Sequence, residues 1–546
     1  MTSTVFARAP VPVPSEASGF HGEYLRGEAR ALAFLPRHPS RDEDWERRIA
    51  EVASGPGARE VWERAHADAE RLGACPESLE NLRALAAGDA LCVTAGQQPG
   101  LFLGPLYTVY KAMTAVALAR SVAERSKRRT VPVFWNAADD SDFGEVGSAF
   151  FAGEAFRLTR HSLDGGELPA GGLVGDLSSA GTRRELDEAR ESFRRRPAGP
   201  ALLEHLERAL SLAEDHGELT TALLYDLFRD TGLVVVDGRW PELRRAAAPL
   251  FKRYAEKREE VATAVVGAGT ALEHAGYRAR LPEASARGAL FDLRDGRRRP
   301  FEGTPADLLA RIADAPETLS PNVLLRPAVQ DFLFPNIATI GGPGEISYHA
   351  QLAPGYELLG LSMPILFPRF EATLVPSGVF ELAQRREAPV ADFVRDFDAA
   401  MKVTAARGLP EALRAGLDDL ERTLTERIER VRPEAERFEK KLAGAVDDTA
   451  RRALDAVRKL REKTAAAARS AETRRDPAVK SYREFLRPRG VLQERVLSAL
   501  TLFLESTSHP LDCLDEALDK HVAAARESRP LHWLLDFGGC RGGETA

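Results

Sequence analysis

Two glutamines stand in a glycine- and proline-rich turn that could bring a ligand close to the backbone. In "TAGQQPGLFLGPLYTVYKA", Gln97 and Gln98 follow an apolar run, and Lys111 stands one or two turns into a helical pattern. Backbone N–H groups at such a junction can bind an anion, and neutral amides can orient a polar substrate. The spacing matches neither GxxxxGK[ST] nor GxGxxG. From spacing alone, a nucleotide or carboxylate site and a structural turn are equally favoured.

Four polar residues follow a second apolar run, in "VPVFWNAADDSDFGEV". They are Asn136, Asp139, Asp140 and Asp142. At the carboxyl end of a strand beside the first, these carboxylates could hold an ammonium group, a sugar hydroxyl or a magnesium ion. A solvated acidic loop is the alternative, and the glycine-rich turn nearby makes the two interpretations about even.

A second flexible junction occurs in "NIATIGGPGEISYHAQL". Gly342 and Gly344 flank a proline after an apolar run, and Glu345 and Tyr348 stand at the start of a helical pattern. Two Gly-Pro junctions at strand ends are difficult to attribute to turn chemistry alone. No carboxylate partner for His349 is evident, so general-base catalysis by this residue is the less favoured interpretation.

Arginines provide further candidate anion sites. Arg369 follows the strand-like "PILFP" and could clamp a carboxylate or a phosphate. In "LRPRGVLQERV", three arginines cluster near a predicted helix start, a position suited to an anion. We expect nucleotide or anion binding in this segment, by Arg487, Arg489, Gln493 and Arg495. The basic run Asp295–Pro300 is more simply explained as a solvated turn.

Composition excludes several classes of protein. The 546 residues are too many for one simple core and predict three or four structural units of about 150 residues each. Lys and Arg total 75 against 82 Asp and Glu, a net charge of −7, so nothing points to nucleic-acid binding. No run of about eighteen apolar residues and no signal peptide is recognisable. We expect a soluble cytoplasmic protein that does not associate with membranes.

The cysteines predict neither disulfides nor a zinc site. Cys75, Cys92, Cys513 and Cys540 stand singly, without a CxxC pair or nearby paired histidines. A mixed His/Asp/Cys metal site assembled by folding stays open. Cys92 lies within an apolar run, where a small buried side chain is favoured over a nucleophile.

Short apolar runs followed by helical patterns predict a parallel sheet. The runs are Leu91–Thr94, Val131–Trp135, Leu233–Val236, Asn336–Ile340 and Ile365–Phe367. Continuous apolar strands that alternate with helices are typical of a sheet covered on both faces. We therefore predict a doubly wound α/β core formed by residues 1–149, 219–266 and 319–395.

Two stretches interrupt this core. Residues 150–218 are rich in Gly, Arg and Glu, and residues 267–318 are charged and irregular. Loops of this length inside a compact domain are uncommon, so both stretches are better explained as inserted subdomains.

A long helical arm is predicted for residues 396–476. Apolar residues recur there at spacings of three and four from Leu413 to Val457, among Ala, Glu, Arg and Lys. This pattern predicts a coiled-coil hairpin that is divided or kinked at Pro433, with an ordinary helical bundle as the alternative. A projecting arm needs a partner for its apolar stripe, so we expect a homodimer. Residues 477–546 are expected to return to the core.

With these segments in hand, the chain resembles the bacillithiol biosynthesis cysteine-adding enzyme family, BshC. The resemblance rests on "TAGQQPGLFLGPLYTVYKA", "VPVFWNAADDSDFGEV", "LSPNVLLRPAVQDFLFPNIATIGGPGEISYHAQL", "PILFPRFEATLV" and "LRPRGVLQERV". These blocks occur in the family's order over most of the chain. The resemblance implies a Rossmann-like core related to class I aminoacyl-tRNA synthetases, two connecting-peptide insertions and a coiled coil that mediates dimerisation.

The resemblance also implies a ligase that joins L-cysteine to the amine of glucosaminyl-malate through an amide bond. ATP or another nucleotide would activate the cysteine carboxylate, and Mg²⁺ could accompany it. Lys111 or Arg369 would offset negative charge, and no residue is assigned to catalysis. The expected substrate-binding residues are Gln97, Gln98, Gly104, Tyr107, Lys111, Asn136, Asp139, Asp140, Asp142, Gly342, Gly344, Glu345, Tyr348 and Arg369.

The acidic motif departs from the family pattern. The family commonly has Glu-Asp-His-Asp where this chain has Asp139, Asp140, Ser141 and Asp142. A role that requires histidine is therefore excluded here, and the synthetase signatures HIGH and KMSKS are absent from the sequence.

Two alternative functions stay open. One is another amino-sugar or thiol ligase or transferase on the same core, and the other is a non-catalytic partner whose coiled coil organises pathway enzymes.

Overall fold

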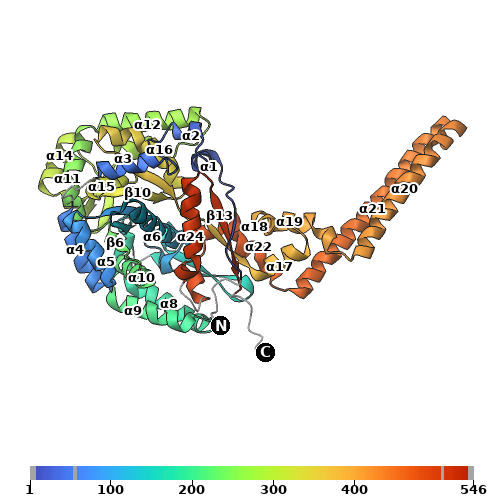
Figure 1. The fold of residues 1–546 in the computed structure, drawn as a ribbon, viewed down its shortest axis with the longest axis horizontal. Helices are drawn as coiled ribbons and strands as arrows, with labels where there is room; N and C mark the ends of the chain where they lie inside the picture. Colours follow the sequence, from blue (N-terminus) through green and yellow to red (C-terminus); the bar gives the residue numbers. More distant parts are fainter. Residues whose placement is uncertain (1–7, 53–57, 166–167, 506–509, 539–546) are drawn as a thin grey trace.

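Five parallel strands form the central sheet of the computed structural model, which describes residues 8–52, 58–165, 168–505 and 510–538 (Figure 1). The strand order is β11–β10–β2–β3–β6. The bounds are β2 Leu91–Gln97, β3 Thr130–Asn136, β6 Val234–Asp237, β10 Asn336–Gly341 and β11 Ile365–Pro368. Their Val, Ile, Leu and Phe side chains are buried because helices cover both faces. The predicted doubly wound α/β class is confirmed.

The order of the connections creates a switch point between β10 and β2. From β2 the chain passes through α6 (Tyr107–Ser126) to β3 and then to β6. It returns at β10 and passes through α16 (Pro343–Leu358) to β11 on the other side of β2. Loops therefore leave the ends of β2 and β10 in opposite directions, which is where doubly wound proteins bind ligands.

Two insertions lie on the β3–β6 and β6–β10 connections. The first contains β4 (Ser148–Ala152), β5 (Leu158–Ser162), α8 (Ser179–Arg194), α9 (Gly199–Leu212) and α10 (His216–Leu227). The second contains the antiparallel strands β7 (Leu290–Arg294), β8 (Arg297–Pro300) and β9 (Leu319–Pro321). The predicted boundary at residue 267 falls inside α12 (Arg258–His274). The whole of this helix belongs to the core, because it packs against α16. The insertions meet where the Arg298 N–H donates to the Gly171 carbonyl at 2.6 Å.

The arm is an antiparallel pair of helices, α20 (Glu411–Phe438) and α21 (Lys440–Arg475), that projects away from the core (Figure 1). The chain turns at Glu439, whose φ of −155° and ψ of 124° lie outside the helical region. Pro433 lies inside α20, so the two helices join six positions after the proline near which a join or a kink was predicted. On this exposed arm, water can satisfy the one carbonyl that loses its helical partner to proline.

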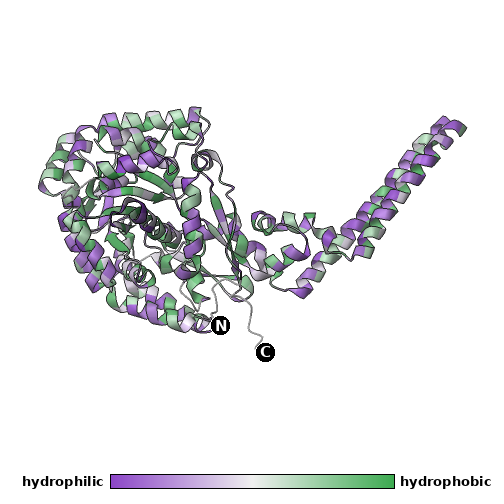
Figure 2. Cartoon of the chain, in the orientation of Figure 1, coloured by the Kyte–Doolittle hydropathy of each residue, from purple (hydrophilic) through white to green (hydrophobic). Residues whose placement is uncertain are grey.

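The end of the chain packs back onto the core. Helix α24 (Pro510–Arg526) contacts α6, and β13 (Leu531–Phe537) pairs with β12 (Ala372–Pro376) and β1 (Val11–Pro14) in a second sheet. Figure 2 shows hydrophobic residues across the sheets and mainly hydrophilic ones along the arm. Within the described ranges, no helix is both long and apolar enough to cross a membrane.

Candidate functional site

The glutamine turn closes the carboxyl end of β2 and depends on glycine. A Cβ atom on Gly100 would lie 1.6 Å from the Gly104 carbonyl oxygen, so only glycine fits this turn. The Pro99 carbonyl accepts a hydrogen bond from the His216 ring at 2.8 Å, which ties the turn to α10. The turn thereby holds Gln97 and Gln98 at the switch point.

Lys111 links the ends of β2 and β10. Its Nζ lies 2.7 Å from Glu345 Oε2 and donates to the Gly96 carbonyl and to Gln97 Oε1, both at 2.9 Å. Burial lowers the pKa of Lys111, and Glu345 only partly opposes this shift. Burial would raise the pKa of Glu345, but Lys111 and the Gly342 N–H outweigh it, and that pKa is lowered. The predicted cation is therefore neutralised by a carboxylate of the predicted site itself.

Tyr107 connects the glutamine turn to a second carboxylate. Its hydroxyl donates to Glu145 Oε1 at 2.9 Å, and Gln97 Nε2 lies 3.2 Å from both oxygens. Three cations lie 5.6 to 5.7 Å from the centre of its ring: Lys111, Arg369 and Arg495. Residues from the first motif and from the C-terminal arginine segment thus meet around one tyrosine.

The acidic loop after β3 reaches the same edge of the sheet. Gln98 Nε2 donates to Asp140 Oδ2 at 2.7 Å, and Arg298 Nη1 lies 3.4 Å from Asp140 Oδ1. Asp139 is buried, accepts a hydrogen bond from Ser320 at 3.0 Å and has its pKa raised by burial. Asp142 is exposed at the start of α7 (Phe143–Val146). In the part of the chain that the structure describes, no group of three His, Cys, Asp or Glu side chains could hold a metal ion.

The start of α16 carries the remaining residues of the second glycine junction. Gly344 is exposed there, and Tyr348 shares a hydrogen bond with Arg326. The Tyr348 ring stacks on His349, with 4.7 Å between ring centroids. Burial lowers the pKa of His349 to about 4, so its ring is neutral near pH 7.

Arg369 and Gln493 are engaged in the interior, and anion binding by these two residues stays a prediction. Arg369 is 2% exposed and forms a two-point ion pair with Glu494, in which Nη1 lies 2.9 Å from Oε2. The Gln493 amide donates to the Leu374 and Phe485 carbonyls at 3.0 and 2.9 Å. Both side chains therefore fasten the C-terminal segment to the core.

Asn136 and Gly104 also face the interior. Asn136 Nδ2 donates to the Gly217 carbonyl at 2.8 Å and to Thr221 Oγ1 at 3.1 Å. The Gly104 N–H donates to the Leu101 carbonyl at 3.0 Å. These groups stabilise the end of β3 and the glutamine turn, and substrate contacts at both positions stay a prediction.

The three C-terminal arginines separate from one another. Arg489 and Arg495 are exposed, and the Arg489 N–H is bonded to Glu484. Arg487 lines a cavity of about 910 Å³ between β1, α1 (Gly19–Leu25), the start of α16 and strands β12 and β13. Its charged lining consists of Arg278, Arg280, Arg395, Arg487, Glu16 and Glu371. A cavity of this size can enclose a ligand as large as a nucleotide.

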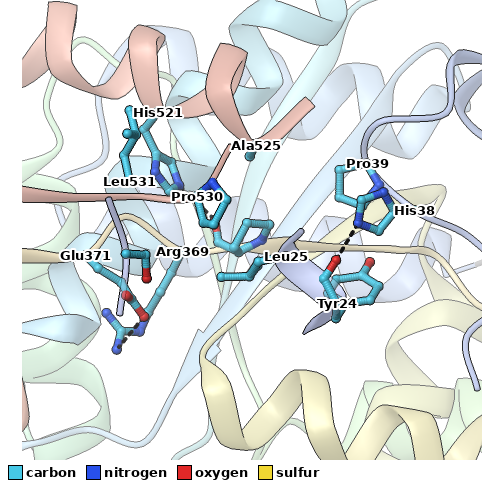
Figure 3. A pocket seen from close by; sticks show the side chains of 12 residues that line it. Tyr24, Leu25, His38, Pro39, Arg369, Glu371, His521, Ala525, Pro530 and Leu531 are labelled. Carbon is cyan, nitrogen blue, oxygen red and sulfur yellow. Dashed lines mark hydrogen bonds and ion pairs between the residues drawn. The ribbon is translucent and has the colours of Figure 1, made fainter. Parts of the chain in front are cut away.

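A second pocket next to this cavity is too small for a substrate. Figure 3 shows Arg369 and Glu371 on one side of it, and Tyr24 with His38 on the other. Its volume of about 10 Å³ is near the minimum for one water molecule. Glu371 lines both pockets, and burial raises its pKa to about 7.

Three charged residues at the strand ends were missed by sequence reasoning: Glu145, Arg298 and Arg326. Glu145 and Arg326 stand inside the motifs "DFGEV" and "NVLLRPAV", but neither directly follows a strand. Arg298 lies in the basic run that we interpreted as a solvated turn, yet its side chain is only 11% exposed. It reaches Asp140 because the second insertion folds back over the core, which a local pattern does not reveal.

The chain is similar to proteins of one family along most of its length. Residues 9–370 match the family model "Bacillithiol biosynthesis BshC, N-terminal Rossmann-like domain", and residues 372–522 match "Bacillithiol biosynthesis BshC, C-terminal coiled-coil domain". A curated relative from Koribacter versatilis, named "Putative cysteine ligase BshC", is 33% identical over 91% of this chain and 94% of its own length. Relatives of the same name from Salinibacter ruber and Bacillus cereus are 30% and 27% identical. They cover 88% and 68% of this chain, and 92% and 71% of their own lengths.

Proposed function

Because this chain belongs to the bacillithiol biosynthesis BshC family, we propose that it joins L-cysteine to the amine of glucosaminyl-malate through an amide bond. One observation carries the proposal: amides, carboxylates and a cation from four segments meet at the switch point through hydrogen bonds. We call these residues the switch-point cluster: Gln97, Gln98, Tyr107, Lys111, Asp140, Glu145 and Glu345.

The reaction requires an activated carboxyl group. The cysteine carboxylate attacks the α-phosphorus of ATP, which gives cysteinyl-adenylate and releases pyrophosphate. The glucosamine amine then attacks the acyl carbon, AMP leaves, and the amine nitrogen loses one proton. For both steps the tasks of the protein are to position the reactants and to stabilise developing charge.

The switch-point cluster offers groups for these tasks. Asp140 and Glu145 are carboxylates at the edge of the cluster, where they suit a substrate ammonium group or sugar hydroxyls. The amides of Gln97 and Gln98 can donate to one partner and accept from another, so they can orient a polar substrate without proton transfer. In this scheme the switch-point cluster recognises the substrates, and the nucleotide supplies the energy for amide-bond formation.

We place the nucleotide in the 910 Å³ cavity. Four arginines line it, including the predicted Arg487, and they suit the charge of a polyphosphate. Pro343 and Ser347 also line it, so the cavity reaches the helix that carries Glu345. Mg²⁺ would enter with the phosphates, since Mg²⁺ is usually bound through substrate phosphates and one or two carboxylates.

An assay with purified protein tests the proposed reaction. Labelled cysteine, glucosaminyl-malate, ATP and Mg²⁺ are supplied, and the thiol product, AMP and ADP are quantified. We expect the amide product and AMP in equal amounts. If ADP is formed in place of AMP, the activated intermediate is an acyl phosphate and not an adenylate, and the ligase assignment still holds. Neither product nor nucleotide cleavage would contradict the proposal.

Two substitutions test whether the switch-point cluster acts in this reaction. Gln98→Ala and Asp140→Asn are each expected to lower kcat/KM about 10- to 100-fold, because each removes a hydrogen-bonding or charged contact. Gln384→Ala at an exposed position of α17 (Ser377–Arg385) and Asp89→Asn at the amino end of β2 are matched controls that should leave kcat/KM unchanged. Normal thiol levels with both cluster variants, together with loss of thiol on arm truncation, would favour a non-catalytic organising role.

A further inference from the structure

Arg326 is a cation at the switch point whose guanidinium has no carboxylate partner among the residues that the structure describes. It stands in the first turn of α15 (Leu325–Leu333), where it is partly exposed. A Cβ on Gly96 would lie 3.6 Å from Arg326 Nη1, which places the guanidinium over the end of β2. Among the described residues, no Asp or Glu oxygen lies within 4.0 Å of it, and Tyr348 shares one hydrogen bond with it.

The other cations around β2 and β10 differ from Arg326 in this respect. Three are paired: Lys111 with Glu345 at 2.7 Å, Arg298 with Asp140 at 3.4 Å, and Arg369 with Glu494 at 2.9 Å. Arg495 is exposed above Tyr107 and is not held over a strand end. A guanidinium has five N–H donors, so Arg326 keeps most of its donors for a ligand.

The surroundings of Arg326 keep it charged without pairing it. Against the effect of burial, Tyr348 and then Glu345, Asp139 and Asp140 raise the pKa of Arg326 and favour its charged form. Each of these carboxylates has another hydrogen-bond partner at 3.0 Å or less. A cation in the first turn of a helix also faces the positive end of the helix dipole, which is unfavourable. Residues that break a local rule in this way concentrate at functional sites.

We propose that Arg326 binds a substrate carboxylate through two parallel N–H···O hydrogen bonds. The planar guanidinium matches the two oxygens of a carboxylate, which an ammonium group does not. The proposal rests on the proposed ligase function, which supplies two sources of that chemistry. They are the α-carboxylate of cysteine and the malyl carboxylates of glucosaminyl-malate. Contact with cysteine would position the group that is activated, and contact with malate would select the amine acceptor.

Calorimetric binding to the full-length protein distinguishes the two sources. Cysteine is compared with cysteamine, which lacks the carboxylate, and glucosaminyl-malate with methyl glucosaminide, which lacks the malyl group. For one of the pairs, we expect Arg326→Met to weaken the carboxylate ligand about 10- to 100-fold and to leave its carboxylate-free partner unchanged. Arg326→Lys should fall between, because it keeps the charge but loses the fork.

Arg253→Met is the matched control, since Arg253 is an exposed arginine that stacks on Phe332 at the other end of α15. It should bind all four ligands as the wild type does. Unfolding midpoints identify variants that fold, and Arg326→Gln replaces Arg326→Met if the latter does not.

Three results would overturn the proposal. They are a wild type without preference in either pair, an Arg326 variant that leaves both pairs unchanged, and one that weakens ADP alone. Carboxylate binding that depends on Arg326 in a protein that forms no amide would refute the ligase and leave the assignment of Arg326 standing.

Discussion

Lys111 and Glu345 form the contact that holds the switch-point cluster together. The Lys111 side chain is 3% exposed and that of Glu345 is 27% exposed, so removal of one partner leaves the other charge poorly solvated. We expect Lys111→Met and Glu345→Gln each to lower the free energy of unfolding by about 1–3 kcal/mol, after a discount for the exposure of Glu345. The double variant should lose less than the sum, as measured by urea unfolding.

The exposed pair Lys252 and Glu256 is the control for this double-mutant cycle. Its charged atoms are 3.8 Å apart on one helix, and the side chains are 63% and 50% exposed. Lys252→Met should change the free energy of unfolding by less than about 0.5 kcal/mol. Additive losses for Lys111→Met and Glu345→Gln would show that the two groups stabilise the protein independently.

Glu371 gives the large cavity a pH response. Burial raises its pKa to about 7, with Arg369 opposing and Glu494 reinforcing the shift. The carboxyl is therefore neutral below this pH and negative above it. Burial lowers the pKa of the cavity residue His21 to about 3, so its ring is neutral from pH 6 to 8, and burial also lowers the pKa of His532.

We expect ADP to bind about 3- to 10-fold more weakly at pH 8 than at pH 6, because the ionised Glu371 repels phosphate. Glu371→Gln should remove this loss. ADP itself gains negative charge between pH 6 and pH 8, which strengthens its attraction to the arginines. This effect is the same for the wild type and for Glu371→Gln. The comparison of dissociation constants between them therefore isolates Glu371. Equal pH dependence would exclude a nucleotide phosphate near this carboxyl.

At the scale of single residues, the sequence predicts contacts that form near the ends of strands. It misses contacts whose partners are far away in the sequence. Gln97 and Glu345 lie at or just after the ends of β2 and β10, and Lys111 reaches both from α6, the helix that follows β2. Arg369 also follows a strand, but its partner Glu494 is 125 positions away, and this ion pair occupies the guanidinium. The unpaired guanidinium of Arg326 likewise becomes visible only when all neighbouring partners are known.

At the scale of elements, continuous apolar runs predicted all five strands of the main sheet, whereas the helix ends were harder to locate. The join or kink expected near Pro433 is a join at Glu439, because an exposed helix can lose one hydrogen bond and continue. The insertion boundary expected at residue 267 lies beyond α12, whose apolar side packs on α16. Propensity alone does not reveal such tertiary contacts.

Pro433 should still weaken the last turns of α20. Pro433→Ala restores a main-chain N–H and is expected to stabilise these turns locally, by up to about 3 kcal/mol. Amide hydrogen exchange of residues 429–438 should slow, while exchange in α21 near the core stays the same. Unchanged exchange at residues 429–438 would mean that fraying near Glu439 dominates the opening of this end.

At the scale of the whole molecule, the arm exposes apolar side chains that two helices cannot cover. Leu417 of α20 and Ala443, Val457 and Ala468 of α21 are buried. Other apolar residues stay exposed: Leu413, Leu420, Val431, Phe438, Leu442 and Leu460. At 100° per residue, the exposed apolar residues of α20, Phe438 included, fall on one narrow stripe beside the buried Leu417. This arrangement is typical of helices that associate with a second pair.

We therefore expect a homodimer joined through the arm. Light scattering should give twice the chain mass of 59.6 kDa, and Leu420→Glu with Leu460→Glu should give the single-chain mass, because a charge in an apolar contact is costly. Ala415→Glu is the control, since it lies about half a turn from Leu413 on α20 and should leave the dimer intact. The switch-point cluster lies in the core, away from the arm (Figure 1). A monomeric variant that keeps its ligase activity would assign the arm to assembly alone, whereas loss of activity would mean that dimerisation supports the site. A wild type with the single-chain mass would contradict the predicted pairing.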